Sequence, residues 1–218
     1  MNKIEELIER LCPDGVEYKA LGEIADCRSG ATPDTKNPDY WENGTIPWMS
    51  SGEVNLRIVE DVEARITKSG FDSCSTKMLP ANTVVVALAG QGKTRGTVAI
   101  TRIELCTNQS LAGLVIKDEN LSPQFLYHFM RSQYEKLRAI SSGDGTRGGL
   151  NLKMLREYKI PVPPLEVQEA IVEVLDSFAE LEAELEAELE ARKAQYAFYR
   201  DKLLDFSDRG GGASHDAG

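Results

Sequence analysis

The sequence feature that most constrains the fold is the stretch from Leu165 to Phe206, which contains neither proline nor glycine. Its apolar residues recur at alternating steps near three and four, as in a coiled coil. We call the following residues the apolar stripe: Ile171, Leu175, Phe178, Leu185, Leu189, Tyr196, Tyr199 and Leu203. A helix of this length would extend about 60 Å, more than a domain of this size can bury. We therefore predict a long dimerisation and spacer helix over 165–206.

Charge separates this stretch from the rest of the chain. The net charge is −10, of which residues 166–218 contribute −9 and residues 1–165 only −1. In 180–190 glutamate alternates with leucine and alanine, a pattern typical of the solvated flanks of a coiled coil. The preceding part contains two basic tracts, 65–102 and 131–159. An acidic protein would disfavour phosphate binding, but here the acidity belongs to the helix, so a nucleic-acid partner remains compatible with residues 1–165.

The remaining chain predicts an α+β fold with one main domain of mixed short strands and helices. Residues 1–13 form a short N-terminal helix, because apolar residues at helical spacing are followed by Pro13 and Gly15. Residues 14–164 form the domain. The glycine-rich end, 207–218, is expected to be disordered.

Within the domain, Val16–Ile116 is mostly β structure. The clearest strands are Thr83–Leu88, Thr97–Thr101 and Leu111–Ile116. After these strands, Ser122 and Pro123 begin a helix that continues to about Ala139, and a short helix spans about Leu152 to Arg156. Finally, the prolines of Ile160–Pro164 predict a stiff, extended connection into the long helix.

A glycine-rich connection, Gly90–Gly96, lies between two of the predicted strands. Its Gly92-Lys93-Thr94 is similar to the end of a phosphate loop, but the glycine required five positions earlier is Ala87, and a phosphate loop opens a helix. A connection of this kind can approach DNA closely. We expect phosphate contacts from Lys77, Lys93 and Arg95, and base contacts from Gln91, Thr94 or Arg147. An ordinary polar turn remains the alternative.

Other classes of function find little support in the sequence. Neither His128 nor His215 has an evident nucleophile or metal partner, so we predict no catalytic residue and no metal. The four cysteines lack ligand spacing and are expected to be reduced, buried thiols. With no long apolar run, we expect a soluble, cytoplasmic protein without a membrane partner. Trp41 and Trp48 could stack on bases, although core packing is favoured.

Several segments, taken in order, resemble the type I restriction-modification DNA specificity (S) subunits. The resemblance covers nearly the whole chain, with no single segment specific by itself. The segments are Ile4–Ile8, Leu11–Tyr18, Leu21–Ile24, Ser29–Pro33, Asn37–Trp41, Ile46–Trp48, Thr107–Gln109, Asn151–Leu152, Ile160–Gln168 and Tyr199–Leu204. Members of this family usually contain two target-recognition domains and two long antiparallel helices. This sequence has one of each and therefore resembles a half-length form.

The resemblance implies a non-catalytic subunit that binds double-stranded DNA and directs methyltransferase subunits, and possibly motor-nuclease (restriction) subunits. S-adenosylmethionine and ATP would be bound by those partners and not by this chain. Pairing with a second copy through the C-terminal helix would form a homodimer that reads an interrupted palindrome. Three alternatives stay open: a coiled-coil adaptor that binds protein without reading DNA, an enzyme of unknown chemistry, and an inactive, truncated or phase-variable fragment.

Overall fold

The computed structural model describes residues 3–90, 94–141 and 149–206 of the chain. It divides into two compact units, unit 1 (Met1–Val172) and unit 2 (Glu173–Gly218), and each is described by itself. The domain boundary predicted at 164/165 coincides with the start of the last helix, whereas unit 1 also includes the first two turns of that helix. Three predicted DNA-contacting residues, Gln91, Lys93 and Arg147, lie outside the described residues, as does the predicted tail.

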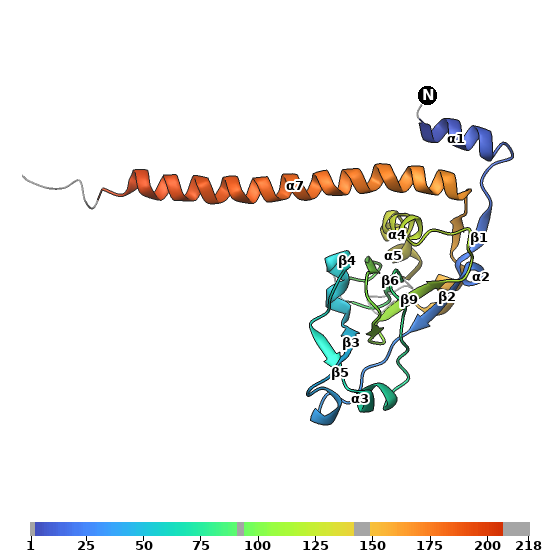
Figure 1. Ribbon diagram of the computed structural model, residues 1–218, viewed down its shortest axis with the longest axis horizontal. Coiled ribbons are helices and arrows are strands. Elements are labelled where there is room, and N and C mark those ends of the chain that lie inside the picture. The colour runs from blue at the N-terminus through green and yellow to red at the C-terminus, as the bar shows by residue number, and fades with distance from the viewer. Residues whose placement is uncertain (1–2, 91–93, 142–148, 207–218) are drawn as a thin grey trace, which may run out of the picture. The chain divides into compact units, whose positions relative to one another are not determined.

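The helices and strands alternate irregularly along the chain (Figure 1). The first ten elements are α1 (Lys3–Leu11), β1 (Tyr18–Ala20), α2 (Leu21–Ile24), β2 (Ala25–Ser29), η1 (Pro38–Tyr40), β3 (Ile46–Met49), η2 (Ser51–Leu56), β4 (Ile58–Val59), β5 (Ala64–Ile66) and α3 (Lys68–Asp72). They are followed by β6 (Val84–Ala87), β7 (Val98–Thr101), β8 (Cys106–Thr107), β9 (Leu111–Ile116), α4 (Pro123–Ser132), α5 (Tyr134–Ser141), α6 (Leu152–Glu157), β10 (Lys159–Pro161) and α7 (Leu165–Leu204). Short strands combined with helices confirm the predicted α+β class.

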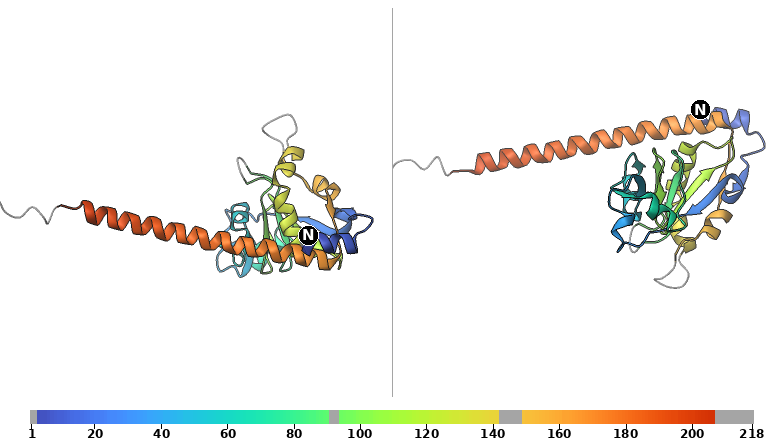
Figure 2. Two further views of the ribbon diagram at one scale, coloured as in Figure 1. Left: turned by 90° about the horizontal axis from the view of Figure 1, so that it is seen from above. Right: turned by 60° about the horizontal axis from the view of Figure 1, so that its bottom comes forward.

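Within the described residues, the main sheet has the strand order β2-β9-β6-β7-β4. Its pairs are antiparallel except that β4 runs parallel to β7. Both faces of this sheet are covered. On one face Val84 and Val86 pack with residues of α4, α5 and α6, and on the other Val85 packs with Val54 of η2 and with Leu105. Figure 2 shows the same sheet from two further sides. Because burial on both faces selects apolar residues at every position, β6 is a continuous apolar run, as the sequence indicated.

A smaller sheet, β5-β3-β8, packs around Trp48. The Trp48 side chain is buried, donates its Nε1–H to the Ala31 carbonyl at 3.0 Å and contacts Trp41 edge-on. Four segments of the family resemblance meet here, because Trp41 contacts Trp48, the Ala31 amide donates to the Thr107 carbonyl and the Thr32 hydroxyl bonds to the Gln109 side chain. Both tryptophans therefore serve packing, the use that the sequence favoured.

The end of unit 1 is joined to its beginning. Strand β1 pairs antiparallel with β10, so the proline-rich connection is extended as predicted. Gln168, in the first turn of α7, is completely buried; its side chain accepts from the Ser122 amide and donates to the Asn120 and Pro163 carbonyls. On the other side of α7, α1 packs through Leu7 against Val167. The first turns of α7 are therefore a part of the core of unit 1.

The predicted helix from Ser122 to Ala139 is wrong in one respect: it is two helices, α4 and α5, separated at Gln133. Gln133 adopts φ −91° and ψ 8°, and its side chain accepts a hydrogen bond from the Tyr158 hydroxyl at 2.9 Å. The break therefore coincides with a contact to a distant segment of the chain. Helix α7 ends at Leu204, two residues before the predicted end.

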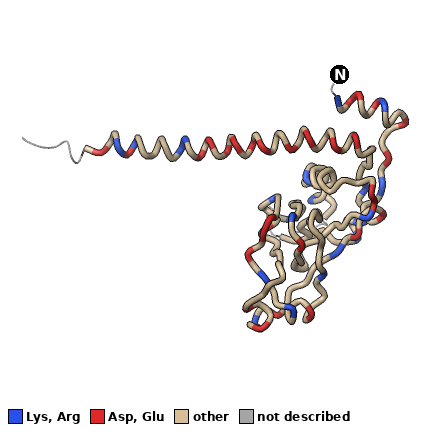
Figure 3. The backbone as a smooth tube through the Cα atoms, viewed as in Figure 1, with Lys and Arg blue, Asp and Glu red and all other residues tan. Residues whose placement is uncertain are grey.

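Unit 2 consists, in its described part, of the remainder of α7, and no residue from Glu173 to Phe206 is buried. The predicted apolar stripe is therefore exposed from Leu175 onward. Ile171 differs, because it packs against apolar residues of unit 1. Acidic residues follow one another along the first half of this helix, and Arg192, Lys193, Arg200 and Lys202 occur in the second half (Figure 3).

Candidate nucleic-acid interface

The glycine-rich connection joins two hydrogen-bonded strands, as the sequence predicted. Strands β6 and β7 pair antiparallel, and Thr94 to Thr97 form a turn in which the Thr97 amide donates to the Thr94 carbonyl at 2.9 Å. Gly96 lies at the third position of this turn with φ +83°, a backbone conformation that a type II turn requires and that favours glycine. The turn therefore places Arg95 at its second position, while Thr94 begins it.

Helix α5 contacts this turn through Arg138. The Arg138 guanidinium donates to the Arg95 carbonyl at 3.4 Å and to the Tyr134 hydroxyl at 3.2 Å, and it lies 5.4 Å from the centre of the Tyr134 ring. Gly96 is buried, and a Cβ atom there would lie 3.4 Å from Cγ of Arg138. The structure therefore joins the two basic tracts that are separate in the sequence.

A second contact between the tracts occurs at the start of the connection. The Leu150 amide donates to the Leu88 carbonyl at 3.0 Å, and the Leu88 amide donates to the Ser110 carbonyl at 2.8 Å. Residues flanking the two glycine-rich loops predicted to face DNA thus lie together. This placement agrees with a common interface, whereas contact with bases stays a prediction.

A pocket of about 380 Å³ adjoins the Thr94–Thr97 turn. It is lined by residues of η2 and the position after it, of the turn and β7, and of α4 and α5: Asn55, Arg57, Gly96, Thr97, Val98, Arg131 and Tyr134. Sequence reasoning did not select this set. Arg131 belongs to one basic tract, but nothing in the local sequence marks Arg57, which reaches the pocket because β4 pairs with β7.

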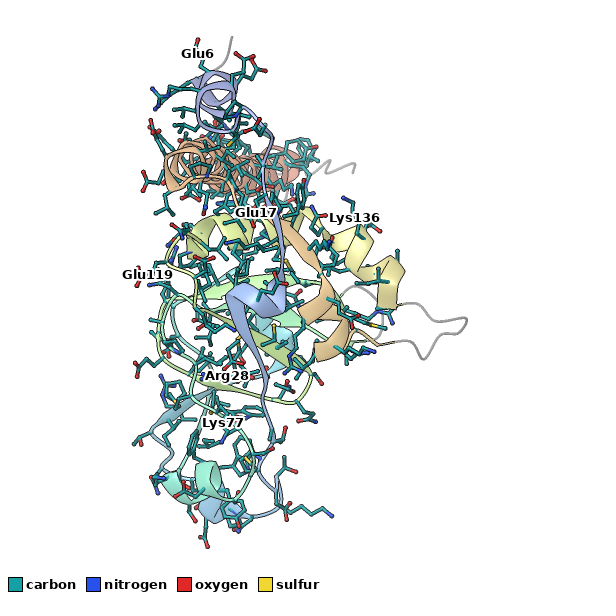
Figure 4. The ribbon with its side chains drawn as sticks, turned by 90° about the vertical axis from the view of Figure 1, so that its right-hand side faces the viewer. Glu6, Glu17, Arg28, Lys77, Glu119 and Lys136 are labelled. Carbon is teal, nitrogen blue, oxygen red and sulfur yellow. The ribbon has the colours of Figure 1, made fainter. Side chains whose placement is uncertain are left out.

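Lys77 is not part of this cluster. Its exposed side chain lies between α3 and the bridge that joins Leu79 to Leu105, near the small β5-β3-β8 sheet. Figure 4 shows Lys77 far from Lys136, which belongs to α5. Of the predicted contacts inside the described residues, Thr94 and Arg95 therefore share one site, and Lys77 would have to act at a second.

Burial and hydrogen bonds shift the pKa values of several side chains in the described residues. Burial raises the pKa of the Cys27 and Cys106 thiols to about 11, so both are neutral thiols at ordinary pH. A backbone hydrogen bond from Asn120 and a side-chain hydrogen bond from Lys19 lower the pKa of Asp118. Cys12 and Cys74 are partly exposed. The buried-thiol prediction holds for two of the four cysteines.

Clusters of metal ligands and membrane-spanning helices are both absent from the described residues. No three of their His, Cys, Asp or Glu side chains come together as metal ligands would. None of the helices in the described ranges has the length and apolarity needed to cross a membrane.

Comparison with known proteins identifies a matching family model and similar curated proteins. A family model described as the type I restriction modification DNA specificity domain matches residues 13–191. The EcoR124I/EcoR124II specificity subunit of Escherichia coli is 34% identical over 197 residues, which cover 88% of this chain and 48% of that protein. The MjaIX specificity subunit of Methanocaldococcus jannaschii is 28% identical, covering 89% of this chain and 45% of the relative. The chain thus spans about half the length of these curated relatives.

Solved structures show the same fold. A chain from work on complex assembly and conformational transition of the type I R-M system has a TM-score of 0.72 at 22% identity, covering 95% of this chain and 50% of that one. The HsdS subunit from Thermoanaerobacter tengcongensis has a TM-score of 0.65 at 20% identity, with the same coverage of both chains. At these identities the likeness concerns the fold alone.

Proposed function

The chain belongs to the type I restriction-modification DNA specificity family, and from this premise we propose that unit 1 recognises a specific sequence in double-stranded DNA. The observation that supports the proposal most is the family match over 13–191, which includes nearly all of unit 1 and the first half of α7. The meeting of two basic tracts at the Thr94–Thr97 turn supports the proposal that this part of unit 1 contacts DNA. The named relatives are specificity subunits, which agrees with a non-catalytic role.

We further propose that this chain supplies recognition to methyltransferase subunits, and to motor-nuclease subunits where these are present, in the cytoplasm. S-adenosylmethionine and ATP would be held by those partners. Calorimetry of the isolated chain should accordingly show no binding heat with either compound. Binding of either one would move the assignment toward an enzyme.

The direct test is selection from a random duplex library, using this chain together with its methyltransferase subunit. We expect enrichment of a defined sequence, and binding of the enriched duplex that weakens steeply with added salt, because neutralised phosphates release counterions. A stable complex with the methyltransferase that enriches no sequence would favour the alternative of a coiled-coil adaptor without DNA reading.

We also propose that two copies of the chain form a homodimer through α7. Phe178, Leu181, Leu185 and Leu189 line an apolar hollow on the exposed helix surface, which a second apolar helix would fill. The charges favour an antiparallel partner, since one copy's acids in 180–190 would then face the other copy's Arg192, Lys193, Arg200 and Lys202. A parallel pair would instead place acids beside acids.

A twofold pair would present two copies of the same reading surface. The enriched sequence should then be an interrupted palindrome. An asymmetric enriched sequence would contradict the homodimer while leaving sequence recognition intact.

A further inference from the structure

The pocket beside the Thr94–Thr97 turn has a composition unlike that of the whole chain. Among the described residues that line it, Arg57 and Arg131 are charged and none is acidic. Tyr134, Thr97 and Asn55 add polar side chains that can donate hydrogen bonds. Arg138 lies against the Tyr134 ring and adds a third guanidinium nearby. The described lining of this pocket therefore carries two positive charges, in a protein whose net charge is −10.

Glu53, the nearest acid that precedes Arg57 in the sequence, is engaged in other hydrogen bonds. The Glu53 carboxylate accepts hydrogen bonds from the Ser50 amide at 2.7 Å, from the Ser50 hydroxyl at 2.8 Å and from the Glu63 amide at 2.8 Å. These donors hold it at the beginning of η2, where it caps the 3-10 helix. Glu53 thus has a structural role at the end of η2 opposite to Arg57.

Arg57 is held in an unusual backbone conformation. Its φ of +66° and ψ of −55° are close to those of a classic γ-turn, which is rare and strained for a residue with a side chain. The conformation is fixed from both sides, because the Arg57 amide donates to the Val54 carbonyl and its carbonyl accepts from the Ile100 amide at 2.9 Å. The other non-glycine residues with positive φ in the described chain are Asn43 and Asn82, a residue type that tolerates it better.

Arg131 approaches the pocket from α4 with its guanidinium supported. It lies 5.4 Å from the centre of the Tyr127 ring and donates to the Tyr127 hydroxyl at 3.3 Å, and Tyr127 itself is buried. An arginine positioned in this way loses less side-chain freedom on binding than a mobile one. Arg57, which directly follows η2, and Arg131 of α4 therefore line the same pocket.

We propose that this pocket binds a backbone phosphodiester of the DNA and thereby fixes the register of unit 1 on the duplex; this inference rests on the proposed DNA recognition. Guanidinium groups match phosphate oxygens in charge and geometry. With a volume of about 380 Å³, the pocket is large enough to admit a phosphate group. Phosphate contacts position a protein and carry no sequence information directly.

The test compares Arg57→Gln, Arg131→Gln and the double variant with a matched control, Arg28→Gln. Arg28 belongs to β2, at the opposite edge of the main sheet from β4, and pairs with Asp26 at 2.7 Å. Circular dichroism establishes that each variant is folded. Affinities for the library-enriched duplex and for an unrelated duplex are then measured across a range of salt concentrations.

We expect each pocket variant to weaken both duplexes by about tenfold at 0.1 M salt, with the preferred sequence unchanged. Because both arginines would hold one phosphate, the double variant should lower the slope of log affinity against log salt by about one and not by two. Arg28→Gln should change the slope by much less than one.

The possible outcomes test the phosphate-binding pocket separately from the proposed DNA recognition. If the parent enriches a sequence but the double variant keeps its affinity and salt slope, the pocket assignment is wrong and DNA recognition stands. If the parent binds no duplex, both fail. Inorganic phosphate serves as a competitor: it should displace DNA less effectively from the double variant than from the parent, and equal competition would also overturn the pocket assignment.

Discussion

Apolar side chains of the same kind have opposite surroundings in the two units. Leu126 in unit 1 is 0% exposed and packs in the helix-covered face of the main sheet, whereas Leu185 in unit 2 is 57% exposed. Phe125 and Phe178 differ in the same way, at 5% and 66% exposed. Unit 1 therefore has a core of its own, while the described part of unit 2 gains nothing from its apolar residues within this chain.

This difference in exposure means that the two units are stabilised by different interactions. Burial of apolar surface contributes about 25 cal/mol per Å², so unit 1 can fold without a partner. A single helix is held by local hydrogen bonds and side-chain pairs such as Arg192 with Glu188, and these pairs contribute only about 0.3 to 0.5 kcal/mol each. Unit 1 should therefore be stable at any protein concentration, and unit 2 should depend on what covers its stripe.

The largest effect is expected from substituting matched leucines in the two units. Leu126→Ala should lower the unfolding free energy of unit 1 by about 2 to 5 kcal/mol, since it leaves a cavity in a packed core. Urea unfolding monitored by tryptophan fluorescence reports unit 1 alone, because Trp41 and Trp48 both belong to it. Leu185→Ala is the control and should change this transition by less than about 0.5 kcal/mol. Equal effects would contradict a separation into two units.

The next effect concerns the first turns of α7, which belong to unit 1. Gln168→Leu should cost about 2 to 4 kcal/mol, because the Ser122 amide and the Asn120 and Pro163 carbonyls would lose their buried partner. The same unfolding measurement applies. Gln195→Leu, on the exposed part of the same helix, should cost under about 0.5 kcal/mol. A small effect at Gln168 would show that the helix start is not part of the unit 1 core.

A third substitution tests the surface of unit 2. Leu185→Glu should weaken self-association by at least about tenfold, equivalent to about 1.4 kcal/mol, because it places a charge in the apolar stripe. Ala187→Glu adds the same charge on the opposite side of the helix and should have little effect. Sedimentation equilibrium measures both. A parent chain that stays monomeric at all concentrations would refute the homodimer.

The smallest effect is a pH dependence confined to unit 1, which contains all four cysteines. Burial raises the pKa of Cys27 and Cys106 from 9.0 to about 11. A raised thiol pKa contributes stability that is complete below about pH 9 and is lost as the pH rises through about 11, so near neutral pH the stability should not change with pH.

Thiol labelling measures the same groups. At pH 8, Cys27 and Cys106 should be modified at least about 100-fold more slowly than Cys12 and Cys74. Raising the pH toward 11 should reduce this difference in labelling rate. The Leu185→Glu variant should leave all four rates unchanged. A change in those rates would mean that unit 1 depends on the helix surface after all.

The parts of the fold that sequence reasoning predicted well are those specified by local patterns. Strand β9 agrees at both ends with the predicted strand, and β6 and β7 agree within one residue, because contiguous β-branched and apolar residues between turns identify buried strands. The break at Gln133 was missed, since no local pattern marks it and the side chain there bonds to Tyr158, which is 25 residues away.

The candidate site was predicted in part for the same reason. Gly90–Gly96 was recognised as a strand connection, because glycine and polar residues between apolar runs are a local signal. Arg57 and Arg138 were not selected, since their neighbours come from distant segments. Lys77 was grouped with Arg95 by charge along the sequence, but it lies in an irregular segment between α3 and the bridge that joins Leu79 to Leu105.

The class of the fold, the long helix with its stripe and the separation of charge between the two parts follow from periodicity and composition, so local sequence patterns are enough to predict them. The family resemblance is likewise read from the sequence. That Arg57 and Arg131 share one pocket and that Gln168 joins α7 to unit 1 could not be predicted before the chain was seen folded. The physical reason is that strand pairing and helix packing bring together residues far apart in the chain, and no local pattern records which distant partner a side chain will meet.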